Sequence, residues 1–197
     1  MRQGTLVTAP TQEPVDMPTL KKHMRVTIPD EDDLIAGYLT AARNYVEEGY
    51  DRALVTQTWD HTIDTFPWWF QEIELPIWPL VSVTSLTYYD TANNPTVWPS
   101  TNYFVDAVSK PGRLVLAFGS GWPSATLRSA NAVVIRYVAG YGDQTQVPWS
   151  TKTAVMLLVE HWYENREPVM AQRGVVPAEI EFTVRALLGR TEIPGVA

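Results

Sequence analysis

The sequence predicts an α+β fold, in which helices from both ends of the chain form a small bundle and an antiparallel β layer or small barrel is inserted between them. Apolar residues recur with helical spacing at both ends, whereas the middle is rich in Val, Thr, Tyr and Trp and is interrupted by turn residues. Neither helical end is long enough to make a core alone. We therefore expect a flexible arm over 1–15, the bundle over 16–54 and 148–190, the inserted β domain over 55–147 and a tail over 191–197.

Two helices are expected near the N-terminus. The first spans about residues 17–25, with Asp16 as its N-cap and Pro18 in its first turn. The second begins after Asp30, whose side chain can cap it, and the acidic residues that follow favour the positive end of the helix dipole. Its apolar residues form one wide stripe, and Gly49 is expected to end it as a C-cap.

Alternation with a period of two begins at Val55 and continues to Thr65, which predicts a strand with one face in water. Two helices are expected after the β region, one from about Pro148 to Arg166 and one from about Pro177 to Leu188. Turn residues divide the region between the first strand and Pro148 into further strands. We expect these strands over 73–75, 81–89, 103–106, 113–116 and 133–139.

The composition of the chain argues against nucleic-acid-binding and membrane proteins. The 197 residues include 22 acidic and 15 basic side chains, a net charge of −7, which argues against a free-standing nucleic-acid-binding protein with its usual basic patch. Only 19% of residues are charged and eight are Trp, so much of the surface is expected to be buried or shared with partners. No apolar run has the length of a signal peptide or a membrane span, and we therefore expect a soluble protein with no membrane association.

The sequence offers little support for catalysis or metal binding. It contains no Cys, which excludes disulfides, thiolate ligands and a cysteine nucleophile. The three His lack the spacing of a zinc site, and Glu160-His161 with Glu164 is the nearest approach to a metal or acid–base cluster. Ser120 lies between two glycines but matches neither a nucleophile elbow nor a phosphate loop. We expect no enzymatic activity, no metal and no cofactor.

Three adjacent aromatic residues are the most unusual feature. Trp68, Trp69 and Phe70 follow the point at which the strand pattern ends, so at least one of them would face water in a strand. An exposed patch of this kind is often an interaction surface. Core packing of the β layer and stacking on a sugar are the alternatives that these residues leave open.

Several short segments along the chain carry a family resemblance. They lie, in order, at 20–26 (LKKHMRV), 30–33 (DEDD), 52–59 (RALVTQTW), 74–76 (ELP), 79–88 (PLVSVTSLTY), 111–114 (PGRL), 121–123 (GWP), 136–142 (RYVAGYG) and 157–167 (LLVEHWYENRE). In order and spacing they resemble the head–tail connector (adaptor) proteins of long-tailed bacteriophages and the related gene transfer agents. The resemblance covers about Leu20 to Leu188, which is most of the chain.

The resemblance implies a structural virion protein without catalytic activity, located in the neck between capsid and tail and assembled in the cytoplasm of a bacterial host. It implies a homo-oligomeric ring of twelve subunits that docks on the portal protein after DNA packaging and joins it to the stopper (head-completion) protein and the tail. Duplex DNA would pass through an acidic lumen without specific binding.

Two groups of residues are expected at interfaces of this ring. The resemblance and the terminal position assign the portal contact to residues 177–197, with Leu187 and Leu188 as apolar anchors and Arg185 and Arg190 as charged partners. A subunit or stopper interface is expected at Trp68, Trp69 and Phe70, because a head-to-tail ring needs two different surfaces on each subunit.

Functions from two other classes stay open at this point. A carbohydrate-binding, tail-associated module would use the same three adjacent aromatic residues. A hydrolase would need Glu160, His161 or Ser120 in a pocket.

Overall fold

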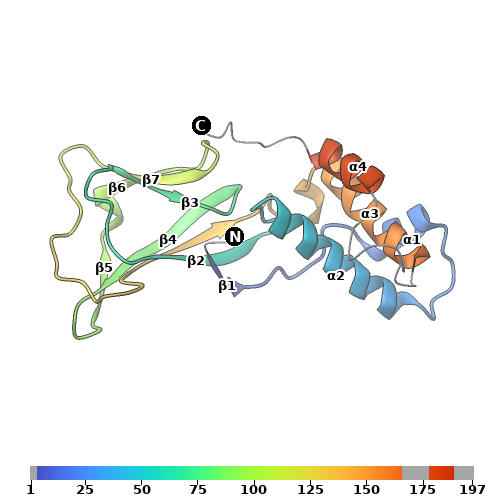
Figure 1. Ribbon diagram of the computed structural model, residues 1–197, viewed down its shortest axis with the longest axis horizontal. Coiled ribbons are helices and arrows are strands. Elements are labelled where there is room, and N and C mark those ends of the chain that lie inside the picture. The colour runs from blue at the N-terminus through green and yellow to red at the C-terminus, as the bar shows by residue number, and fades with distance from the viewer. Residues whose placement is uncertain (1–3, 166–177, 189–197) are drawn as a thin grey trace. The chain divides into compact units, whose positions relative to one another are not determined.

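The computed structural model describes residues 4–165 and 178–188 (Figure 1). The chain divides into two compact units. The β unit comprises Met1–Thr11 and Asp51–Tyr141, and the helical unit comprises Gln12–Tyr50 and Gly142–Ala197. Each unit is therefore built from two separate stretches of chain.

The larger sheet of the β unit has five antiparallel strands in the order β1-β2-β8-β4-β5. The strand β8 is central, and it pairs with β2 on one side and with β4 on the other. Figure 1 shows these long strands side by side. Their bounds are β1 Thr5–Thr8, β2 Gln57–Ile63, β4 Leu80–Tyr89, β5 Pro95–Trp98 and β8 Val133–Ala139.

The smaller sheet has three antiparallel strands in the order β3-β7-β6. Its strands are β3 Glu72–Leu75, β6 Tyr103–Asp106 and β7 Gly112–Leu116. In the described part of the chain both sheets are open, so the β region is a pair of antiparallel sheets and not the small barrel that the sequence also allowed.

Aromatic and branched side chains fill the core of the β unit. Period-two alternation places Gln57, Trp59 and His61 of β2 on the buried face, as the sequence predicts. The core cluster consists of buried residues that include Trp59, Phe66, Trp98, Tyr103, Trp122, Ile135 and Tyr137.

The helical unit contains α1 (Met17–Met24), α2 (Asp32–Gly49), α3 (Trp149–Glu164) and α4 (Ala178–Leu188). As expected, Asp16 caps α1, because its carboxylate accepts a hydrogen bond of 2.8 Å from the Thr19 backbone N–H. The helix α3 packs against α2 and α4, and α1 also contacts it. Their buried residues include Leu20 of α1, Ile35, Leu39 and Val46 of α2, Val155, Leu158 and Val159 of α3 and Val184 of α4.

The structure corrects several expected boundaries. Residues 1–15 are not simply a flexible arm, because Thr5–Thr8 forms β1 and pairs with β2. The helix α2 begins at Asp32 and has Glu31, not Asp30, at its N-cap position, without a side-chain capping bond. Gly49 is the last residue of α2, and the C-cap is Tyr50.

At the C-terminal end, α3 ends at Glu164, and Arg166 lies outside the described residues. The expected tail over 191–197 also lies outside them. Among the described residues, no helix has the length and apolarity to cross a membrane.

Candidate functional site

The three adjacent aromatic residues lie in the connection between β2 and β3 of the β unit. Trp68, Trp69 and Phe70 are 54%, 95% and 68% exposed. None of the three is part of the buried core cluster, so the alternative that they pack in the core of the β layer is wrong. Large apolar side chains at this level of exposure form a surface that can bind a partner.

Hydrogen bonds and a buried ring support the backbone of this connection. Phe66 is fully buried and stacks on Trp122, with ring centroids 5.4 Å apart and planes at 16°. The indole Nε1–H of Trp122 donates a 2.9 Å hydrogen bond to the Phe70 carbonyl oxygen. The Phe70 N–H in turn donates to the Pro67 carbonyl oxygen at 2.9 Å. A surface presented on a fixed backbone loses little conformational entropy when it binds.

Two further exposed aromatic residues belong to the same end of the small sheet. Phe104 of β6 is 66% exposed, and it pairs with Val115 of β7, which in turn pairs with the first residue of β3. Phe118 follows the end of β7 and is fully exposed. The backbone of Gln71, next to Phe70, accepts a 2.8 Å bond from the Leu116 N–H, which places the two connections together.

We call Trp68, Trp69, Phe70, Phe104 and Phe118 the aromatic edge. Large aromatic side chains offer about 150–250 Å² each, so five largely exposed rings offer on the order of 800 Å². A standard protein interface buries about 800 Å² on each partner. The aromatic edge alone therefore supplies enough area for one side of a specific contact.

The opposite end of the small sheet is polar and internally bonded. The carboxylate of Asp106 accepts hydrogen bonds from the Val108 and Ser109 N–H groups and from the Ser109 hydroxyl. It also accepts a 3.0 Å bond from Nε of Arg113. The Ser109 bonds and the Arg113 guanidinium hold the pKa of Asp106 well below its usual range. Val108, in the same hairpin, is 91% exposed.

The residues considered for catalysis make ordinary structural contacts. Glu160 lies 3.2 Å from Nε2 of His23, and Nδ1 of His161 lies 3.1 Å from Nδ2 of Asn165. In the β unit, the Ser120 N–H donates to the Ala117 carbonyl oxygen within a turn. Over residues 4–165 and 178–188, no group of three His, Asp or Glu side chains has the geometry of a metal site.

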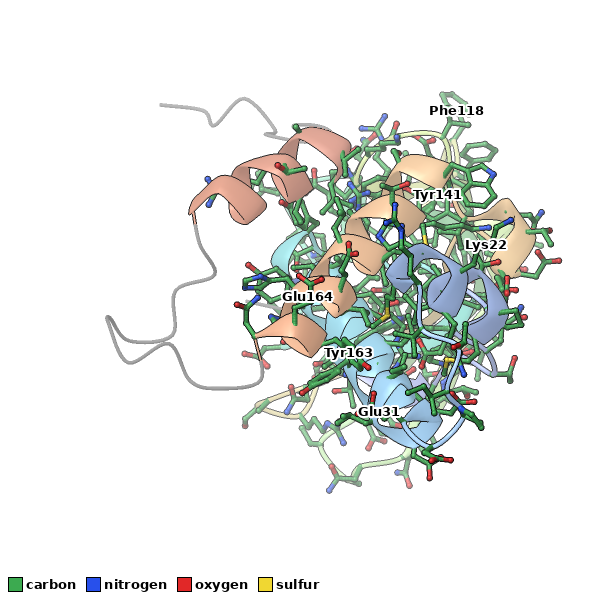
Figure 2. All side chains as sticks on the ribbon, turned by 90° about the vertical axis from the view of Figure 1, so that its right-hand side faces the viewer. Lys22, Glu31, Phe118, Tyr141, Tyr163 and Glu164 are labelled. Atoms are coloured by element: carbon green, nitrogen blue, oxygen red, sulfur yellow. The ribbon has the colours of Figure 1, made fainter. Side chains whose placement is uncertain are left out.

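Figure 2 shows another contact of the helical unit, in which Tyr163 of α3 lies beside Glu31. The Tyr163 hydroxyl donates a short hydrogen bond to the Glu31 carboxylate. This bond connects α3 to the N-cap position of α2, so the Glu31 side chain has a structural role within the helical unit.

The residues expected at the portal contact differ in accessibility. Arg185 is exposed, Leu187 is half-buried and Leu188 is only 6% exposed. Because α4 packs on α3, Leu188 lies within the helical unit and is not accessible as an anchor in this structure. Arg190 lies outside the described residues.

Comparison with family models decides the relationship of this chain to known proteins. The model described as "Head completion protein" matches residues 15–173, which is most of the chain. The chain belongs to the head completion protein family. Comparison with curated proteins found no match.

Solved structures show the same fold as this head completion protein. A chain from the neck of an empty gene transfer agent particle, computed with C6 symmetry, has a TM-score of 0.75 at 23% identity over 94% of this chain and 95% of that one. A chain from the virion of the native particle gives 0.73 at 22% identity, with 93% of each chain covered. A chain from the neck of the native particle, computed with C12 symmetry, gives 0.72 at 22% identity, with 94% of each covered.

Proposed function

We propose that this head completion protein is a non-enzymatic subunit of a ring in the virion neck. The ring docks on the portal protein after DNA packaging and joins it to the stopper protein and the tail. The observation that carries the proposal is the shared fold over nearly the whole chain with proteins from gene transfer agent necks. Family membership supports the same class of structural virion protein.

Ring formation is supported by the symmetry of those particles and by the surfaces of this chain. The similar neck structures were computed with C6 and with C12 symmetry, both of which suit a ring of twelve identical subunits. A closed ring needs two different surfaces on each subunit. The aromatic edge meets the area requirement for one of them, and it serves a neighbouring subunit or the stopper in this proposal.

The portal contact is proposed for the C-terminal segment. Arg185 is exposed on α4, Leu187 is half-buried two residues later on another side of the helix, and Arg190 follows in the sequence. Leu188 instead holds α4 on α3. A cut before α4 would remove Val184 and Leu188 from the packing of the helical unit, so a truncation should end after Leu188. Such a truncation tests the part of the contact that lies beyond α4 and leaves Arg185 and Leu187 in place.

The acidic character of the chain suits a DNA conduit. With a net charge of −7 for each subunit, a ring lined by this protein would repel phosphates, so duplex DNA would pass without being held. Binding to DNA is therefore not part of the proposed role.

Negative-stain imaging of the purified chain mixed with its portal protein tests the proposal. We expect an additional ring of density on one face of the portal. The double variant Trp68→Ser/Trp69→Ser is the matched control. Both side chains are exposed, so the fold should survive their loss, and a weaker ring on the portal would show that the aromatic edge joins neighbouring subunits. A wild-type chain that leaves the portal undecorated at saturating concentration would contradict the proposal.

A further inference from the structure

The helical unit exposes a second apolar surface, on α2. Leu34 and Tyr45 are 40% and 39% exposed, and Tyr38 and Ala41 continue the same side of the helix at spacings of three and four residues. Trp162 of α3 lies against Tyr45, with ring centroids 6.2 Å apart at 88°. We call these five residues the α2 stripe.

The α2 stripe lies beside the core of the helical unit. The neighbouring side of α2 carries Ile35, Leu39, Ala42 and Val46, which are all buried. A surface helix usually has one apolar face toward the core and a polar face toward water. Here the apolar surface is wider than the core requires, so part of it is available to a partner.

We propose that the aromatic edge of one copy packs on the α2 stripe of the next copy in the ring. This inference rests on the proposed function, because it assumes a ring of identical subunits. It commits the aromatic edge to a second copy of this chain and not to the stopper protein, and it names the surface that receives it.

Ring geometry and chemistry favour this pairing. A surface that pairs with itself gives a two-fold dimer, whereas a ring, in which the rotation closes, needs two different surfaces that pair head to tail. Each copy exposes the aromatic edge on its β unit and the α2 stripe on its helical unit, so one contact between copies covers both. The aromatic edge contains no ionisable side chain, and burying it against apolar and aromatic residues leaves no charge without a partner.

Area also supports a second copy as the partner. The aromatic edge offers on the order of 800 Å², which equals one side of a standard interface, and aromatic residues are enriched at the anchors of such contacts. On the α2 stripe, two Tyr and one Trp supply rings that can meet those of the edge. Contacts between aromatic rings are more favourable than the area they bury accounts for alone.

Disulfide trapping can test the pairing, because the chain contains no Cys and each introduced thiol is unique. We would mix full-length Trp69→Cys with full-length Tyr45→Cys under mild oxidation. The matched control replaces Trp69→Cys with Val108→Cys, which is equally exposed but lies at the opposite end of the same sheet. Circular dichroism of each variant establishes that it is folded.

Docked thiols have an effective concentration in the millimolar range, so at about 0.1 mM chain the Trp69→Cys pair should be trapped about tenfold faster than the Val108→Cys pair. Equal rates for the two pairs would overturn the inference. Preferential formation of a Trp69→Cys dimer with itself would also overturn it, because the edge would then pair symmetrically.

Imaging separates this inference from the proposed function. Rings on the portal without the faster trapping would leave the proposed function in place and refute only the pairing of these two surfaces. An undecorated portal would refute the proposed function itself.

Discussion

The division of the aromatic residues into buried and exposed groups leads to a quantitative prediction. Phe66 is fully buried and contacts Trp122, Tyr88 and Trp98, with ring centroids 5.4, 5.9 and 6.3 Å away. Phe66→Ala removes these contacts and leaves a cavity, which costs about 3–5 kcal/mol in the free energy of unfolding of the β unit. Trp69 is 95% exposed, and Trp69→Ser should change the same quantity by less than about 0.5 kcal/mol.

Urea unfolding followed by tryptophan fluorescence measures both variants. Six of the eight Trp belong to the β unit, so fluorescence reports mainly on that unit. For a slope of about 1–3 kcal/mol per molar urea, Phe66→Ala should lower the midpoint by at least about 1 M. Equal losses of stability for Phe66→Ala and Trp69→Ser would show that the exposed ring is part of the core and would refute this division.

Two further predictions concern single residues of the β unit. Folding lowers the pKa of Asp106 below the ordinary aspartate value of 3.8. The Asp106 carboxylate therefore stabilises the folded state at neutral pH, and this contribution is lost as the pH falls below 3.8. The difference in urea midpoint between wild type and Asp106→Asn should therefore shrink between about pH 6 and about pH 2, and a constant difference would contradict the assignment. Gly140 has φ 134°, and a Cβ there would lie 2.6 Å from the Val55 carbonyl oxygen, so Gly140→Ala should lower the melting temperature. The control is Gly37→Ala in α2, where an added Cβ would meet no atom within 4 Å, and it should raise the free energy of unfolding by about 0.5–1 kcal/mol. A loss of stability at both positions would contradict this steric explanation.

Local patterns in the sequence predict the elements that depend on local physics. The strands at 103–106 and 133–139 and the Asp16 cap match the structure because alternation and capping act within a few residues. The sequence did not predict the two edge strands of the five-stranded sheet, β1 and β5. Thr5–Thr8 is only four residues long and exposed throughout, and Pro95 begins β5, where an edge strand tolerates the missing N–H.

The candidate site was predictable only in part. The sequence singles out Trp68, Trp69 and Phe70 because they are adjacent. Phe104 and Phe118 lie far from them in the chain, and only the pairing of β6 and β7 with β3 brings them to the same end of a sheet. No local signal marks that register, because it follows from contacts between distant segments. The burial of Leu188 likewise depends on α4 packing against α3.

The central position of β8 has a consequence for biosynthesis. The strand β8 is the last of the sheet to be made, yet β2 and β4 both pair with it and are joined through it. The five-stranded sheet therefore cannot assemble until residue 139 has left the ribosome. The apolar face of α2 likewise stays unburied until α3, about 100 residues later, has been synthesised. At about 5–20 residues per second this delay is on the order of 5–20 s. During this interval the nascent chain exposes apolar surface, so protection by chaperones should raise the yield of folded subunits more than it would for a protein built from local contacts.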